Sequence, residues 1–242
     1  MKPNKYLYHA LQQPHILIAG ATGSGKSVTI HNLIYIIRHI QGAKMILIDT
    51  KKVELYEYKN LYNTMLYTDS IAGTVQALKK IIDIMDSRFI YLRRAGLKKL
   101  ESDPVYIIID EYADLVLSGN KALIQMIIKI SQLGRAANIH LIIATQRPTA
   151  DVIDKKISVN LTARLCLRVA CAVDSRNVIG CNGGESLPSF GRAIYWNEGY
   201  TYTIDLPPPP PELPHTNAKK DFKSFSIIIL VIVIIILTML LL

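Results

Sequence analysis

Residues 15–27 of this chain read HILIAGATGSGKS, a short apolar run followed by a glycine-rich segment, a lysine and a serine. The segment from Gly20 to Ser27 fills every fixed position of the pattern G-x-x-x-x-G-K-[ST]. Glycines let the backbone turn its N–H groups inward around phosphate oxygens, and a helix that begins at the lysine adds positive potential. The pattern predicts a phosphate-binding loop between a strand at His15–Ala19 and a helix at 26–40.

The residues of this loop have distinct expected parts. Lys26 would reach the β- and γ-phosphates of a nucleotide, and the Ser27 hydroxyl would bind Mg²⁺. A guanine nucleotide would require N-K-x-D, and Asn120-Lys121-Ala122-Leu123 lacks the aspartate. We therefore expect ATP and Mg²⁺ as cofactors. The predicted ATP-binding residues are Gly20, Ala21, Thr22, Gly23, Ser24, Gly25, Lys26 and Ser27.

A pair of acids ends a second apolar run, Ile107-Ile108-Ile109-Asp110-Glu111. A carboxylate at the carboxyl end of a neighbouring strand would lie beside the phosphate loop, where Asp110 can hold the magnesium ion. Glu111 can then accept a proton from an attacking water as general base. The pair indicates an enzyme that hydrolyses a nucleoside triphosphate rather than a small-molecule kinase, which needs no such water activator.

Two further polar positions are weaker signals on physical grounds alone. Gln146 follows the apolar run 140–144, where a neutral side chain can bond the γ-phosphate, although such residues are more often ordinary surface groups. Arg135 follows an amphipathic stretch, 121–133, where an arginine is also a usual partner of the helix dipole. The residues by themselves leave the role of Arg135 open.

The body of the chain alternates strand and helix patterns. The apolar positions from Val75 to Leu92 are spaced three and four apart, which predicts one long amphipathic helix over 70–96. Fully apolar strands between such helices indicate an α/β fold with a mostly parallel sheet covered on both faces. Besides the first strand, the expected strands are 45–48, 105–109, 140–144, 164–170, 192–196 and 200–204, the last two forming a hairpin.

Composition narrows the class of protein. Half of the 242 residues are hydrophobic, which excludes disorder as a description of the whole chain. Three cysteines exclude a disulfide framework. The charge balance is 28 Lys and Arg against 19 Asp and Glu, or +9, which agrees with a polyanionic partner such as nucleic acid or anionic lipid.

The end of the chain differs from the body. Five consecutive prolines, 207–211, predict a stiff spacer. In residues 227–242 Thr238 is the only polar residue, and Lys219, Lys220 and Lys223 precede the run. A helix of that length spans about 24 Å, a marginal crossing of the ~30 Å hydrocarbon core. We expect a single-pass C-terminal membrane anchor with the body on the cytoplasmic face.

The resulting division of the chain has four parts. These are a lead-in (1–13), a nucleotide-binding domain (14–206), a proline-rich linker with basic residues (207–225) and the anchor (226–242). A docking peptide or a strand is the alternative for the last part, because Ile and Val also favour β structure.

Several motifs together resemble the FtsK/SpoIIIE DNA translocases. Besides the phosphate loop they are Ile48-Asp49-Thr50-Lys51, Asp110-Glu111-Tyr112-Ala113-Asp114-Leu115, Arg135-Ala136-Ala137-Asn138-Ile139-His140 and Ala144-Thr145-Gln146-Arg147-Pro148. Asp174-Ser175-Arg176 and Gly191-Arg192-Ala193-Ile194-Tyr195 also fit, so the resemblance runs from about Pro14 to Leu206.

The resemblance implies a RecA-like motor domain that works as a homohexameric ring on double-stranded DNA. It makes Arg135 an arginine finger that completes the neighbouring subunit's site, and Gln146 the sensor of the γ-phosphate. Arg147 and Arg176 fall where such motors contact the DNA backbone. The family's other domains have no counterpart in this sequence, so we expect a motor of a mobile element or phage rather than one for chromosome segregation directed by sequence motifs.

Three hypotheses about function follow. The first is a membrane-tethered, ATP-driven translocase of double-stranded DNA in transfer or segregation. The second is a motor that packages a phage genome. The third is an adaptor that binds nucleotide only to assemble at a membrane.

Overall fold

The computed structural model describes residues 4–211. The predicted anchor and most of the predicted linker, residues 212–242, lie outside this range. Within it, no helix is both long enough and apolar enough to cross a membrane.

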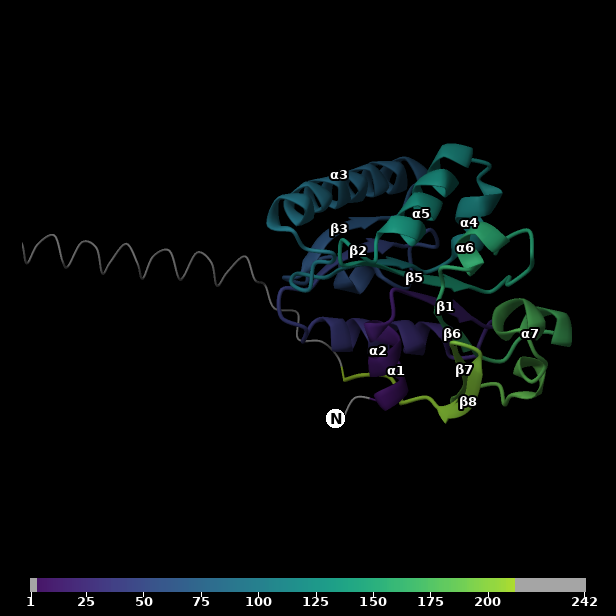
Figure 1. Cartoon of the computed structure of the whole chain (residues 1–242). Coiled ribbons are helices and arrows are strands. Elements are labelled where there is room, and N and C mark those ends of the chain that lie inside the picture. Colours follow the sequence, from purple (N-terminus) through teal and green to yellow (C-terminus); the bar gives the residue numbers. More distant parts are fainter. Residues whose placement is uncertain (1–3, 212–242) are drawn as a thin grey trace, which may run out of the picture.

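A sheet of eight strands forms the centre of the described residues, with helices on both sides (Figure 1). Its spatial order is β3-β2-β4-β5-β1-β6-β7-β8, and the first six strands run parallel while β7 and β8 are antiparallel. The predicted α/β class with a mostly parallel sheet is therefore confirmed. The strands are β1 (His15–Ala19), β2 (Lys44–Ile48), β3 (Thr64–Thr68), β4 (Val105–Ile109), β5 (Ile139–Thr145), β6 (Ala163–Cys166), β7 (Arg192–Asn197) and β8 (Tyr200–Asp205).

Two apolar layers separate the sheet from its helices. One face carries α3 (Ile71–Ala95), α4 (Tyr112–Leu117), α5 (Lys121–Leu133), α6 (Lys155–Ser158) and α7 (Ala172–Ile179). The other face carries α1 (Lys5–Gln12) and α2 (Lys26–Ile37). Residues of β1, β2, β4 and β5 are buried almost without interruption, because both faces of the parallel strands are covered. Two short 3₁₀ turns, Tyr56–Tyr58 and Gly184–Ser186, complete the elements.

The first helix belongs to the folded body rather than to a separate lead-in. Asn4 caps α1 by accepting hydrogen bonds from the backbone N–H groups of Tyr6 and Leu7. Leu7, Ala10 and Leu11 are buried in the core layer that they share with α2. The sequence predicts a domain that begins at Pro14, and in the structure the core layer also includes residues of α1 from Leu7 onward.

Other differences from the expected elements lie at edges. β3 and the short helices α4, α6 and α7 carry too little periodicity to be read from the sequence. The expected strand 164–170 ends at Cys166. The residues after it bond the end of β1 and the start of the phosphate loop, through Leu167 N–H to the Ala19 carbonyl and Ala21 N–H to the Arg168 carbonyl. At the other end of the body, Asn32 of α2 donates to the carbonyl of Pro208 at 3.0 Å, so the start of the proline run lies against α2.

Candidate functional site

Strand order brings the predicted site residues together at one edge. β5 lies between β1 and β4, and β2 lies on the far side of β4. The carboxyl ends of these four neighbours therefore place side by side the phosphate loop, Thr145-Gln146, Asp110-Glu111 and the segment that begins at Asp49.

The loop has the backbone that its glycines allow. Gly23 and Gly25 have φ of +75° and +93°, a region that other residues rarely adopt. A Cβ on Gly20 would lie 2.4 Å from Ser24 Oγ, so the tight turn has no room for a side chain there. A cavity of about 300 Å³ opens over the loop and α2, lined among others by Lys26, Ser27, Glu54, Gln146 and Phe190.

Lys26 turns inward and pairs with Asp110. Its ammonium donates to Asp110 Oδ1 and to the Asp110 carbonyl oxygen, both at 3.1 Å, and the two side chains are 5% and 0% exposed. Burial raises the pKa of the Asp110 carboxyl, and the Lys26 ammonium opposes that rise. When a nucleotide binds, its phosphate oxygens would replace the Asp110 carboxylate as the partner of the Lys26 ammonium.

The other carboxylate oxygen of Asp110 fits a metal ion. Among residues 4–211, Oδ2 is buried and has no hydrogen-bond partner, although a buried acceptor without a partner is costly. Ser27 lies at the neighbouring start of α2 and lines the cavity. A hydroxyl and a carboxylate are oxygen ligands of the kind that Mg²⁺ prefers. The residues present therefore fit the predicted magnesium site.

Glu111 is 3% exposed and fully engaged with protein groups. Its Oε1 accepts from the Thr145 hydroxyl at 2.7 Å and from the Gln146 N–H at 3.1 Å. Its Oε2 accepts from the same N–H at 3.2 Å and from the Lys51 ammonium at 2.9 Å. The predicted general base is thus held beside the segment that carries Gln146.

Gln146 lies at the rim of the cavity. Its Oε1 accepts from the Thr22 hydroxyl at 3.2 Å, so this side chain bridges the end of β5 and the phosphate loop. That position agrees with a contact to the terminal phosphate of a bound nucleotide.

Arg135 lies away from this site. It is exposed in the turn between α5 and β5, at the amino edge of the sheet, whereas the phosphate loop lies at the carboxyl edge. The structure therefore does not bring Arg135 together with the other predicted catalytic residues of its own chain.

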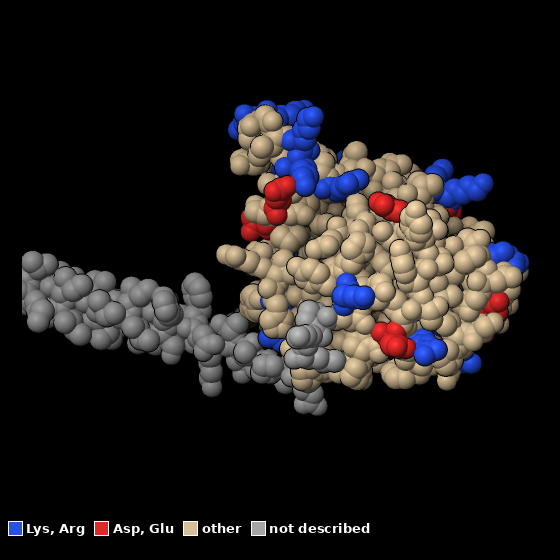
Figure 2. Space-filling view, turned by 60° about the horizontal axis from the view of Figure 1, so that its bottom comes forward, with Lys and Arg blue, Asp and Glu red and all other residues tan. Residues whose placement is uncertain are grey.

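The turn that carries Arg135 is held by a residue of α3. The guanidinium of Arg88 donates to the carbonyls of Ala137 at 2.7 Å, Asn138 at 3.2 Å and Asp103 at 2.6 Å. Arg93 and Arg94 in the last turn of α3, and Lys98 and Lys99 shortly after it, are exposed and take no part in this contact. Figure 2 shows a group of Lys and Arg side chains at the upper left of the molecule.

The two predicted DNA contacts are both exposed. Arg147 follows Gln146, and its backbone N–H donates to the Thr145 hydroxyl at 3.1 Å. Arg176 lies on α7 and donates to the Asn182 side-chain oxygen at 2.7 Å. Both guanidinium groups can reach a phosphate backbone without loss of buried structure.

Three residues of this arrangement were missed from the sequence. Sequence reasoning predicts none of the contacts of Lys51, Thr145 and Arg88, because each acts through a partner that is distant along the chain. Lys51 and Thr145 lay inside motifs already singled out, which is the only signal that could have pointed to them.

Comparison with known proteins agrees with this geometry. A profile described as "FtsK/SpoIIIE family" matches residues 2–105 and 101–150. The chain belongs to the FtsK/SpoIIIE family. It is 35% identical over 209 residues to DNA translocase FtsK of Borreliella burgdorferi and 36% identical over 208 residues to DNA translocase SpoIIIE of Bacillus subtilis. These matches cover 78% and 76% of this chain and 26% of each relative.

The FtsK/SpoIIIE domain described here spans about a quarter of the length of these curated relatives. Among solved structures, the pCW3 conjugation coupling protein TcpA with ATPgS superposes with a TM-score of 0.72 and 27% identity. The superposition covers 80% of this chain and 60% of TcpA. The fold is that of the P-loop ATPases of this family.

Proposed function

We propose that this FtsK/SpoIIIE domain hydrolyses ATP to move double-stranded DNA, as a homohexameric ring tethered to the cytoplasmic face of a membrane by its C-terminal segment. The observation that carries the proposal is the set of groups at the carboxyl edge of the sheet. A phosphate loop, an acid pair and a polar rim residue meet there around one cavity. The relatives with this domain are named DNA translocases, which supports DNA as the substrate.

Each group has a part in hydrolysis. With nucleotide bound, Lys26 would exchange its contact with Asp110 for one with the phosphates, and Ser27 and Asp110 would hold Mg²⁺. When bound, that ion neutralises the charge that develops on the phosphate oxygens. Glu111 accepts the proton of the attacking water, and Gln146 contacts the terminal phosphate. Arg135 of one subunit completes the site of its neighbour, which its place at the opposite edge supports.

DNA transfer or segregation is the setting that we favour. TcpA is named a conjugation coupling protein, and its similarity supports transfer. The membrane anchor at 226–242, the spacer before it and the domain division rest on the sequence patterns alone.

The proposal is tested by the rate of ATP hydrolysis with and without linear duplex DNA. The full chain is purified in detergent and compared with Lys26→Ala and Glu111→Gln. We expect duplex DNA to stimulate the wild type, and each substitution to lower the stimulated rate at least about 100-fold. Glu111→Gln should still bind ATP, whereas Lys26→Ala should not.

Other outcomes identify the other functions. ATP binding without hydrolysis would favour the nucleotide-binding adaptor. An ATPase rate that is the same with and without duplex DNA would contradict a DNA motor. A DNA-stimulated rate that appears only with capsid components would favour genome packaging.

A further inference from the structure

The general base of this site is held by contacts that catalysis must break. Both oxygens of Glu111 are taken: the Thr145 hydroxyl and the Gln146 N–H bind one, and the Gln146 N–H and the Lys51 ammonium bind the other. A carboxylate that is to accept a proton from water needs a free lone pair that points at that water. The Glu111 side chain is only 3% exposed and is not among the residues that line the cavity over the phosphate loop.

Lys51 is firmly attached to the start of α4. Its neighbour Thr50 donates to Asp114 Oδ2 at 2.8 Å, so the two residues contact Glu111 and Asp114 together. Partial burial disfavours the ammonium, but the hydrogen bond and charge of Glu111, with the charges of Asp110 and Asp114, raise the pKa of Lys51 overall. Lys51 therefore stays charged beside Glu111.

Thr145 connects this arrangement to a predicted DNA contact. Its hydroxyl donates to Glu111 and accepts from the backbone N–H of Arg147 at 3.1 Å. Glu111 is thus two hydrogen bonds away from the backbone of an exposed arginine. A displacement of residues 145–148 alters the partners of Glu111 directly, because Thr145 and Gln146 supply three of its four contacts.

We propose that Lys51, Thr145 and the Gln146 N–H form a latch that holds Glu111 idle, and that DNA contact at Arg147 releases it. This inference rests on the proposed function and adds its regulation. In the latched state Glu111 cannot align a water molecule, so ATP hydrolysis is slow until DNA binds. Displacement of residues 145–148 breaks the hydrogen bond between the Thr145 hydroxyl and Glu111. Lys51 is then a positioning residue, which holds Glu111 in the latched state and acts on hydrolysis only through it.

The test removes one donor of the latch and measures coupling. Lys51→Met keeps the length of the side chain and removes its charge. The matched control is Lys52→Met, an exposed lysine at the next position. Lys51→Arg keeps a charged donor. Thr145→Val is the second variant, since valine preserves the shape of the buried side chain and removes its hydroxyl.

We expect Lys51→Met and Thr145→Val to raise the DNA-independent kcat about tenfold, as expected for loss of one hydrogen bond to a charged group. The stimulation by DNA should fall toward one, while KM for ATP stays within about twofold of the wild type. Lys52→Met and Lys51→Arg should keep the wild-type ratio of the ATPase rates with and without DNA. If Lys51 had only a structural role, Lys51→Met would change KM or stability and would not change the ratio of the rates with and without DNA.

The inference fails if the wild type responds to DNA and Lys51→Met keeps the same stimulation ratio or loses DNA-independent hydrolysis. That result would leave the proposed function intact. A wild type that hydrolyses ATP at one rate with and without DNA would instead overturn both.

Discussion

Two ion pairs dominate the chemistry at the level of single residues. Lys26 with Asp110 and Lys51 with Glu111 are each short and each include a nearly buried carboxylate. A buried ion pair gains little net stability, because desolvation offsets much of the attraction. Both pairs are therefore better understood as arrangements that a phosphate, a metal ion or a movement of the strand ends can replace.

Outside the site, Arg88 is the residue whose replacement we expect to lower the stability of the fold most. Arg88→Ala removes a charged donor from three carbonyl oxygens in two loops. We expect the free energy of unfolding to fall by about 2 kcal/mol in urea denaturation, the range for hydrogen bonds to a charged group.

Arg93→Ala is the matched control, because Arg93 is exposed on the same helix. It should change the unfolding free energy by less than about 0.5 kcal/mol. Equal losses in the two variants would show that Arg88 does not brace the turn of Arg135.

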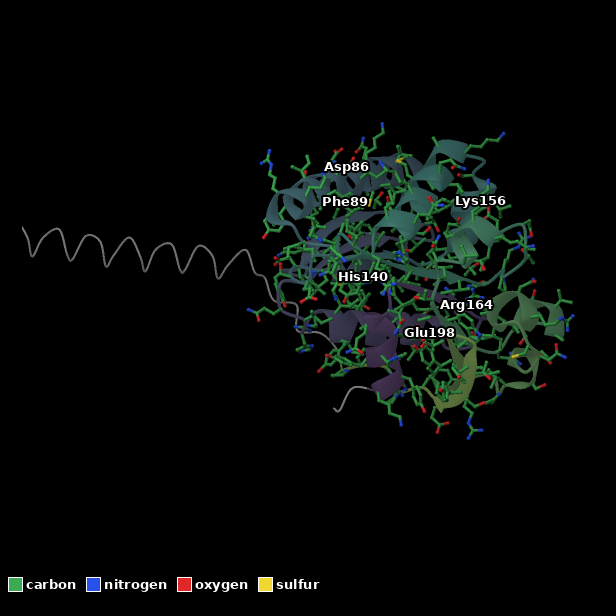
Figure 3. All side chains as sticks on the ribbon, viewed as in Figure 1. Asp86, Phe89, His140, Lys156, Arg164 and Glu198 are labelled. Carbon is green, nitrogen blue, oxygen red and sulfur yellow. The ribbon has the colours of Figure 1, made fainter. Side chains whose placement is uncertain are left out.

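At the level of elements, the loops after the parallel strands carry the function, and the strand starts carry a pH-sensitive part of the stability. His15 begins β1 and its Nδ1 accepts from the Leu141 N–H at 2.9 Å. His140 of β5 stacks on Tyr106 with ring centroids 4.9 Å apart and lies near the middle of the molecule in Figure 3. Burial lowers the pKa of both histidines, that of His15 to about 3.

The sign of the resulting pH dependence follows from which state binds protons. Below the ordinary pKa of about 6.5 the unfolded chain protonates His15, while the folded chain keeps it neutral down to about pH 3. Stability is complete above pH 6.5 and falls as the pH decreases from there. Between pH 7.5 and 5.0 we expect a loss of about 2 kcal/mol from His15, measured by urea denaturation at each pH.

His15→Gln should flatten this dependence, since the amide can still accept from Leu141 without titrating. His39→Gln, at an exposed position, should leave the dependence as in the wild type. A profile that is unchanged in His15→Gln would contradict the assignment.

At the scale of the whole molecule, the two edges of the sheet carry different functional groups. The phosphate loop follows β1 at the carboxyl edge of the sheet, and Arg135 precedes β5 at the amino edge. A head-to-tail contact between copies would bring one edge to the other and can close into a ring. This arrangement supports the proposed hexamer.

Mixing two inactive variants tests that arrangement. Lys26→Ala lacks the phosphate contact and Arg135→Ala lacks the finger, so each alone should be inactive with DNA. In an equal mixture, an intact loop meets an intact Arg135 at about a quarter of the interfaces, which should restore about a quarter of the wild-type ATPase rate. A mixture that stays inactive would contradict action between subunits.

The sequence alone determined the phosphate loop, the acid pair and the α/β class. Each depends on a local pattern: glycines at fixed spacing, a carboxylate after an apolar run, and apolar positions repeated for buried strands or for one face of a helix. His15–Ala19, Val105–Ile109 and Lys121–Leu133 form as expected for that reason. The positions of Arg147 and Arg135 were taken from the resemblance, and their roles remain predictions.

Only the tertiary structure decided which of these groups meet. Lys51 reaches Glu111 because β2 lies beside β4, and Thr145 reaches it because β5 lies between β4 and β1. Arg88 braces the turn of Arg135 because α3 packs beside the loop that enters β5. Strand order is set by the summed packing of both core layers, which no local pattern encodes, so the partners of Glu111 and Arg135 could be found only in the folded chain.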